Sequence, residues 1–356
     1  QEIFSLAENN SFRHSQLSRS SKTFINLSKM KRFYTFFIIL SIFSTCFSQS
    51  KELLGKWVLV RSTLVGNINL DLNNPDYSTK LIYFITPKAL QFSRYKLPAT
   101  FTDTQIKTEF RTINYVLKDK YLILQDQYDN KISYFLKADD FVRKNSEFAL
   151  KPLVRNADSL YVANNLNDYE LSDNQDYEEL ISLNSKEAGR SSKTFTDLYF
   201  QIEFVLTKNN KIENIKILHS IDENYDQDYI RALKKSEKFL KNISGKNLLI
   251  TKEVNHLKWA NDLKDKNERQ LYDLLDKGFK NYTENNFEKA IEAYSQIENL
   301  PIANNRFNSL IKDSQVKLGV SYLVTGMREE ACKTFNKIGD KTDFDIRNYL
   351  LDFCTQ

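Results

Sequence analysis

The feature that most constrains the fold of this chain is an internal repeat in its last 90 or so residues. Five positions, Gly278, Tyr282, Asn285, Ala290 and Tyr294, recur 41 residues later as Gly319, Leu323, Gly326, Ala331 and Phe335. Small residues at fixed offsets let two antiparallel helices approach closely, and the aromatic residue fills the groove between them. The repeat therefore predicts two helical hairpins of the same design.

The offsets within each copy, 0, 4, 7, 12 and 16, resemble those of tetratricopeptide (TPR) repeats. The signature positions are Gly278, Tyr282, Ala290, Tyr294, Gly319, Tyr322, Gly326, Ala331 and Phe335. The usual period is about 34, so about seven residues are inserted around 299–308. Two repeats rarely bury a core alone, and we expect a helix over Asp345–Cys354 to cap them. An ordinary helical hairpin bundle is the alternative. TPR grooves bind peptide segments, so the resemblance implies a docking surface for a partner protein.

Met30 begins a segment with the pattern of a secretory signal peptide. Lys31 and Arg32 precede an apolar run over 33–43, and cleavage after Ser48 would leave Gln49 as the new N-terminus. The run is too short for a membrane span, which needs about 20 apolar residues. We expect 1–29 to be a disordered upstream extension and 30–48 to be the signal peptide. A lipoprotein signal, with lipidation at Cys46, is the alternative.

Removal of residues 1–48 on export changes the net charge of the chain and leaves two of its cysteines. Six of the 51 basic residues and two of the 46 acidic residues lie in 1–48, so 45 basic and 44 acidic residues remain. A nearly neutral chain does not favour a nucleic-acid partner. Cys332 and Cys354 also remain, and disulfides persist in exported proteins. We expect these two cysteines to pair, with two buried free thiols as the alternative.

The first part of the exported chain alternates apolar and polar residues in short runs. These runs predict strands over Lys56–Thr63, Lys80–Ile85, Ile106–Leu117, Tyr121–Gln125 and Lys131–Lys137. The separators Lys118–Lys120 and Asp129–Asn130 are short enough to join neighbouring strands as hairpins. The pattern predicts an antiparallel meander that closes into a small barrel or forms a curved sheet over 49–152.

Gly55 and Trp57 resemble the G-x-W start of lipocalin-like domains, in which the Trp plugs the base of the barrel. A generic β-sandwich or open sheet with a buried Trp is the alternative. The resemblance implies a possible small apolar ligand. Six aromatic residues are numerous enough to line its pocket, although they could equally fill a solid core: Tyr83, Phe84, Phe92, Phe110, Tyr115 and Tyr134.

An acidic stretch over 153–196 is typical of a solvated connector, with a short surface helix as the alternative.

A small α+β unit follows over 197–262. Strands are expected over Leu198–Thr207, Lys211–His219 and Leu248–Leu257, with a helix over Tyr225–Leu240. This ββαβ order resembles the TonB C-terminal domain family. The matching residues are Phe204, Val205, Lys211, Ile212, Ile215, Ile217, Leu218, Asp226, Ala232 and Leu233. The chain departs from the family pattern in two places: Asn210 stands where Gly is usual, and no Pro follows the helix, where Phe239 only partly substitutes for the common W-x-P. The family binds proteins, so the resemblance implies a second recognition surface.

No residue pattern in the chain predicts catalysis, a cofactor or a metal. His219 and His256 have no second ligand at i+2 or i+4, and no G-x-S-x-G motif is present. The acidic run Asp222–Asp228 lacks the Gly and Glu of a calcium loop and reads as a helix N-cap.

The sequence therefore predicts a multidomain α+β protein, with helical hairpins over 263–356. We expect a non-enzymatic protein of the cell envelope, in the periplasm, at the outer membrane or outside the cell. Its partner would be an envelope protein or peptide segment. The alternative function is a lipocalin-like carrier of a small apolar ligand.

Overall fold

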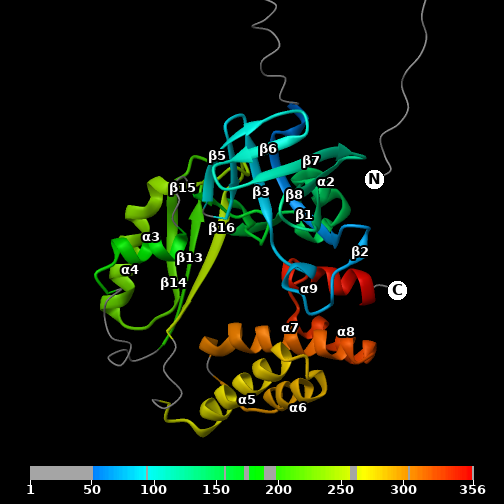
Figure 1. Cartoon of the computed structure of the whole chain (residues 1–356). Helices are drawn as coiled ribbons and strands as arrows, with labels where there is room; N and C mark the ends of the chain where they lie inside the picture. Colours follow the sequence, from blue (N-terminus) through cyan, green and yellow to red (C-terminus); the bar gives the residue numbers. More distant parts are fainter. Residues whose placement is uncertain are drawn as a thin grey trace, which may run out of the picture. The chain divides into compact units, whose positions relative to one another are not determined.

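The computed structural model describes residues 51–93, 95–155, 158–171, 176–187, 198–256, 263–303 and 305–354. All of them belong to one compact unit, Gln49–Gln356. The fold is α+β, as the sequence predicted, with an antiparallel barrel, a mixed sheet with helices and C-terminal helical hairpins (Figure 1). The expected signal peptide and its cleavage site at Ser48 and Gln49 lie outside the described residues.

Eight strands form the barrel. They are β1 (Gly55–Leu64), β3 (Ile82–Thr86), β4 (Ala89–Phe92), β5 (Tyr95–Phe101), β6 (Gln105–Thr108), β7 (Thr112–Lys118), β8 (Tyr121–Asp126) and β9 (Lys131–Lys137). Each pairs antiparallel with the next, and β1 pairs with β9 from Trp57 opposite Lys137 to Leu64 opposite Lys131. A short strand, β2 (Ile68–Asn69), pairs only with the end of β1. Closure between β1 and β9 removes the open edges of this sheet.

The strand predictions were correct where a recognisable turn separates the strands. The prediction of one strand over Ile106–Leu117 was wrong, because a turn between Thr108 and Thr112 divides it into β6 and β7. The amide of Arg111 donates to the Thr108 hydroxyl at 3.2 Å and closes this turn, although no Gly or Pro marks it. The sequence also missed β4 and β5. Pro98 in β5 lowers its resemblance to a strand.

The base of the barrel is sealed. Trp57 is 2% exposed and its indole nitrogen donates to the carbonyl of Leu53 at 2.8 Å. Leu53 ends the short 3₁₀ helix η1 (Lys51–Leu53) and is itself fully buried. Both side chains belong to the barrel core. Removal of a buried Trp costs about 3–5 kcal/mol, so this plug makes a large contribution to barrel stability.

The mixed sheet has the strand order β10 (Lys151–Arg155), β11 (Asp158–Val162), β16 (Leu248–Asn255), β13 (Tyr199–Leu206) and β14 (Ile212–His219). Only β11 and β16 are parallel. Helices α3 (Tyr177–Asn184) and α4 (Glu223–Ser236) cover one face (Figure 1). β12 (Glu170–Leu171) pairs with β15 (Leu240–Lys241) beside them. Alternate residues of β13 reach the helices, which explains why Phe200, Ile202 and Phe204 are fully buried.

Local sequence rules explain the boundaries in this sheet. Asn210 has φ 62°, and Asn is tolerated in this left-handed conformation, so it can stand where Gly was expected. Asp222 accepts a hydrogen bond from the amide of Tyr225 and caps α4, as predicted. The acidic stretch contains the short helix that was the alternative to a connector, and it also contains strands. It supplies β11, and α3 buries Leu180 because its apolar residues face α4.

The helical region contains α5 (Lys266–Thr283), α6 (Phe287–Ile297), η8 (Asn305–Phe307), α7 (Asn308–Val324), α8 (Arg328–Ile338), α9 (Phe344–Tyr349) and the π-helical turn η9 (Leu350–Cys354). The helix expected over Asp345–Cys354 is thus present as α9 and η9. In the chain as described, no helix has the length and apolar composition needed to cross a membrane.

The two hairpins share one design. A Cβ placed on Gly278 would lie 2.4 Å from the ring of Tyr294, and one on Gly319 would lie 2.4 Å from the ring of Phe335. Asn285 and Gly326 occupy equivalent turns and both have positive φ, 59° and 81°. The contacts of Gly278 with Tyr294 and of Gly319 with Phe335 require the two helices of each hairpin to lie very close together. Only Gly has no side chain to obstruct this approach, which accounts for its recurrence.

The C-terminal segment joins the hairpins to the barrel. The side chain of Asn348 donates to the carbonyl of Tyr77 at 2.7 Å, and the Tyr349 hydroxyl donates to the carbonyl of Leu72 at 2.7 Å. The Tyr77 hydroxyl donates to Asp352 at 2.7 Å. Leu70 and Tyr77 also share an apolar cluster with α7 and α8. Part of the surface of these two helices is therefore covered by the chain's own loop.

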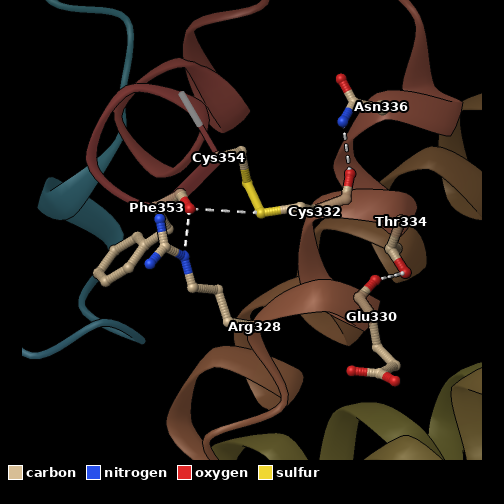
Figure 2. The surroundings of a disulfide bond; sticks show 7 residues. All are labelled: Arg328, Glu330, Cys332, Thr334, Asn336, Phe353 and Cys354. Atoms are coloured by element: carbon tan, nitrogen blue, oxygen red, sulfur yellow. Dashed lines mark hydrogen bonds between the residues drawn. A yellow bond between two sulfur atoms is a disulfide. The ribbon is translucent and has the colours of Figure 1, made fainter. Parts of the chain in front are cut away.

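A disulfide holds this C-terminal segment. Cys332 on α8 is bonded to Cys354 on η9 (Figure 2), which confirms the predicted pairing. Arg328 donates to the carbonyl of Phe353 beside the disulfide. The bond closes a loop of 22 residues, and such a loop stabilises a fold by about 3 kcal/mol. A structural disulfide indicates an oxidising, extracytoplasmic environment.

Candidate functional site

The two ends of the barrel differ in character. The end that contains Trp57 is plugged, and apolar side chains such as Leu90 and Ile106 fill the middle of the barrel. At the opposite end, the β6–β7 and β8–β9 turns and the loop between β2 and β3 surround a cavity of about 240 Å³. A second cavity, of about 320 Å³, lies at the Trp57 end and is lined by Trp57, the β7–β8 turn and Asp140. Because Trp57 belongs to the barrel core, it separates that cavity from the barrel interior. The cavity inside the barrel is therefore the one at the opposite end, and the mouth of a barrel is a common place for a small-ligand site.

The cavity is lined by inward-facing residues of the strands and by charged residues at the strand ends. The lining residues are Leu59, Ser62, Asp76, Leu81, Tyr83, Phe92, Arg111, Ile113, Leu124, Asp126, Asp129, Lys131, Ser133 and Phe135. The apolar members lie toward the filled part of the barrel, because they also belong to the barrel core. Two cationic and three acidic residues surround the rest.

The charged residues form two separate ion-paired groups, one around Lys131 and one made of the Arg111–Asp126 pair. Lys131 contacts Asp76 at 2.5 Å and Asp129 at 3.8 Å. Arg111 Nη1 lies 3.8 Å from Asp126 Oδ2, which is too long for a direct hydrogen bond. Both members of the second pair are partly exposed, at 31% and 23%. Arg111 also donates to the Tyr83 hydroxyl and Asp126 accepts from the amide of Tyr128. A guanidinium has five N–H donors, so these contacts leave donors on Arg111 that a ligand could use.

Aromatic rings fix the orientation of Arg111. Its guanidinium carbon lies 5.2 Å from the centroid of the Phe92 ring, within cation–π range. Phe92 packs edge-on against Tyr83, with centroids 5.6 Å apart. Burial raises the pKa of Tyr83, while a hydrogen bond from the neighbouring Arg111 opposes this shift. Ser62 and Ser133 add a pair of hydroxyls 3.2 Å apart.

Large aromatic residues are exposed on the turns at this same end. Tyr95 follows the β4–β5 turn, Phe110 lies in the β6–β7 turn and Tyr128 lies in the β8–β9 turn. They are 46%, 74% and 85% exposed. The three turns at this end of the barrel therefore each expose a large aromatic side chain to solvent.

The aromatic residues expected to line a pocket are divided between the two faces of the barrel wall. Tyr83, Phe92 and Tyr115 point inward, and the first two reach the cavity. Phe110 is exposed on its turn, and Phe84 lines a different cavity outside the barrel. Tyr134 lies between Ser133 and Phe135, both of which face the interior, so its side chain points outward. The sequence did not identify Arg111, Asp126 or Lys131.

The signature residues of the helical repeat lie in the core of the hairpins. Ala290, Tyr294, Ala331 and Phe335 are all at most 2% exposed. Tyr282 and Tyr322 are partly buried and contact both apolar clusters of the helical region. These residues hold the helices together, and none of them forms an open site.

His219 and His256 both pack against tyrosine side chains. His256 Nε2 lies 3.0 Å from the Tyr225 hydroxyl, and the His219 ring packs on Tyr199 with centroids 4.9 Å apart. Over the described ranges, no three His, Cys, Asp or Glu side chains are arranged to hold a metal ion.

A larger cavity of about 450 Å³ lies where β11 diverges from β16. Lys252 lines it, with Nζ 4.7 Å from the ring centroid of Tyr169 and 5.0 Å from that of Tyr177. Burial lowers the pKa of Lys252, while the nearby carboxylate of Asp168 opposes this shift. The Lys252 ammonium is therefore stabilised by the two aromatic rings and by Asp168. Its role is to pack the sheet against α3.

No protein-family model matches the chain, and comparisons with curated proteins and with solved structures also gave no match.

Proposed function

We propose that this protein binds a small polar ligand at the open end of its barrel, and that it acts by binding rather than by catalysis. One observation carries the proposal: the barrel, plugged by Trp57, holds at its other end a cavity lined by two cationic and three acidic side chains that form ion pairs. Burying a charged side chain costs free energy. Buried or half-buried charges therefore occur preferentially at sites where they bind a ligand or take part in chemistry.

The proposal rests on a lipocalin-like interpretation of the barrel. The G-x-W start, Gly55 and Trp57, and the up-and-down order of eight strands support it. The cavity changes the expected ligand class. An apolar ligand would cover the Arg111–Asp126 pair without offering it a hydrogen bond, and covering polar groups in this way is costly. The lining therefore favours a polar ligand over the apolar one that the sequence suggested.

Native mass spectrometry of the full chain tests this proposal. We expect the wild-type protein to retain or take up a molecule of low mass. The variant Ser133→Leu should lose it, because the larger side chain would fill the cavity. A conservative change outside the barrel, Val154→Ala on the exposed strand β10, is the control and should leave uptake unchanged. Equal occupancy in all three proteins would contradict the proposal.

A second candidate function is protein binding through the mixed sheet, in line with the TonB-like resemblance of 197–262. Among the described strands, β14 pairs only with β13. An edge strand can accept a strand from a partner protein. Leu218 on β14 is 40% exposed. If β14 receives a partner strand, Leu218→Lys should reduce partner capture from envelope extracts, while Val154→Lys on the opposite edge should not. Equal capture by both variants would reject this edge.

The TPR-like interpretation of the hairpins is less well supported as a source of partner binding. Leu70 and Tyr77 of the same chain pack against α7 and α8, so part of the helical surface is already occupied. The structural disulfide supports the expected export. A periplasmic or outer-membrane location is our proposal for the compartment.

A further inference from the structure

We infer that the ligand of the barrel cavity is a free α-amino acid, with its carboxylate on Arg111 and its ammonium on Asp126. This inference rests on the proposed function, because it names the ligand class of the same site. The argument depends on the separation of the two charges, on their surroundings, on the charge of the whole lining and on the size of the cavity.

The separation of the two side chains matches an amino-acid head group. Arg111 Nη1 and Asp126 Oδ2 lie 3.8 Å apart, so the two groups are adjacent without a direct hydrogen bond. An α-amino acid carries its carboxylate and ammonium on a single carbon. It can therefore contact both side chains at once, and each ligand charge meets the opposite charge of the protein. Arg binds carboxylates especially well because its N–H groups can form two parallel hydrogen bonds.

The surroundings hold these two side chains in place. The Arg111 guanidinium lies over the Phe92 ring, which supports it from one face. Asp126 accepts a hydrogen bond from the amide of Tyr128 at 3.2 Å through Oδ1, whereas the contact with Arg111 involves Oδ2. Asp126 is thus oriented by its own turn. A preorganised pair of this kind loses little side-chain freedom when it binds a ligand.

The charge of the whole lining disfavours simpler ligands. Lys131 is already in contact with Asp76 and Asp129, so Arg111 is the cation that remains for a ligand carboxylate. A plain carboxylic acid would place a negative charge in a cavity with more acidic than basic residues. A plain amine would leave Arg111 without a carboxylate. A zwitterion satisfies both members of the pair without changing the net charge.

The size and the apolar part of the lining fit one amino acid. The volume of about 240 Å³ lies below the roughly 300–1,000 Å³ of typical pockets for drug-sized ligands, so it suits a smaller molecule. Ile113, Leu124 and Phe135 line the inner part of the cavity, so an apolar side chain would point toward them. We therefore expect a preference for small or medium apolar amino acids over large or charged ones.

The test is calorimetric titration of the full chain with single L-amino acids at low ionic strength. The amide and the N-acetyl derivative of the best ligand are tested in parallel, since each removes one charge. We expect both derivatives to bind at least about 10-fold more weakly. Arg111→Gln and Asp126→Asn should each weaken amino-acid binding by about 10-fold or more. The control Arg143→Gln removes an exposed arginine on α2 (Ala138–Lys144) and should change the affinity less than about 2-fold.

Asp126→Asn preserves the size of the side chain, so it keeps the test valid if Arg111→Gln fails to fold. Equal binding of the amino acid, its amide and its N-acetyl derivative would overturn the inference. A second arm titrates the same proteins with a fluorescent fatty acid. Uptake of the fatty acid into the wild-type cavity without any amino-acid binding would reject both the amino acid and the polar ligand of the proposed function. A different small polar molecule retained in native mass spectrometry, without amino-acid binding, would reject the amino acid alone. No binding in either arm would also count against the proposed function.

Discussion

The close contact between Gly278 and Tyr294 makes a prediction with an unusual sign. In an exposed helix, replacing Gly by Ala stabilises a protein by about 0.5–1 kcal/mol. At Gly278 the new Cβ would lie 2.4, 2.6 and 2.7 Å from three carbons of the Tyr294 ring, which is buried and cannot move freely. Overpacking of this kind costs about 1–3 kcal/mol. We expect Gly278→Ala to destabilise the fold by about 1–2 kcal/mol.

Urea denaturation followed by far-ultraviolet circular dichroism measures this effect. Gly319→Ala should behave in the same way, because its Cβ would meet the Phe335 ring at the same distance. A double-mutant cycle provides the control. In a Tyr294→Leu background the ring is gone, so Gly278→Ala should become neutral or stabilising. A Gly278→Ala protein as stable as the wild type, or more so, would refute the close-contact explanation of the repeat.

Three further predictions concern stability. Reduction of the disulfide, or Cys354→Ser, should lower the free energy of unfolding by about 2–4 kcal/mol in urea titrations; an unchanged midpoint would contradict this. Tyr77→Phe removes the hydrogen bond to Asp352 and should cost about 1–2 kcal/mol in the same assay, whereas Tyr128→Phe, at an exposed position, should cost almost nothing. Burial raises the pKa of Tyr229 to about 12 from its ordinary value of 10.0. Its folded form therefore keeps the proton while the unfolded form ionises, so stability should fall as pH rises from 10 to 12, and Tyr229→Phe should make this fall shallower.

Much of the fold could be predicted because local patterns agree with the tertiary structure. Alternation identified β1, β8 and β9, and the period of 41 identified the two hairpins. The positions 285 and 326 recur because their turn needs a left-handed residue, which only Gly and Asn adopt easily. Cys332 and Cys354 could be paired because both fall on helices that were expected to pack together.

Other elements could not be predicted because they depend on distant residues. β11 is assigned to the mixed sheet by a short parallel pairing with β16, more than 80 residues later in the chain. No local pattern identifies such a partner. Tyr77 in the barrel loop packs against Tyr349 on α9, with ring centroids 4.9 Å apart. Neither local sequence contains a pattern that predicts this contact.

The sequence contains a weak indication of the cavity, because two charged residues fall at inward-facing strand positions. Alternate residues of a strand face the same side. Arg111 therefore faces inward with Ile113 and Tyr115, and Asp126 faces inward with Leu122 and Leu124. An inward charge at a strand end usually marks the solvated mouth of a barrel or a binding site. The missing information was which strand ends lie together. The turn at 109–111, hidden in an apparently continuous strand, determines that.

The most direct test of the central claim is methyl nuclear magnetic resonance of the full chain during ligand titration. Ile113 and Leu124 report on the cavity, and Leu218 reports on the β14 edge. With a mixture of free amino acids, we expect saturable shifts at the first two methyl groups and none at Leu218. Shifts confined to Leu218 on addition of envelope extract, with the cavity methyl groups unchanged by every small molecule, would contradict a ligand-binding barrel.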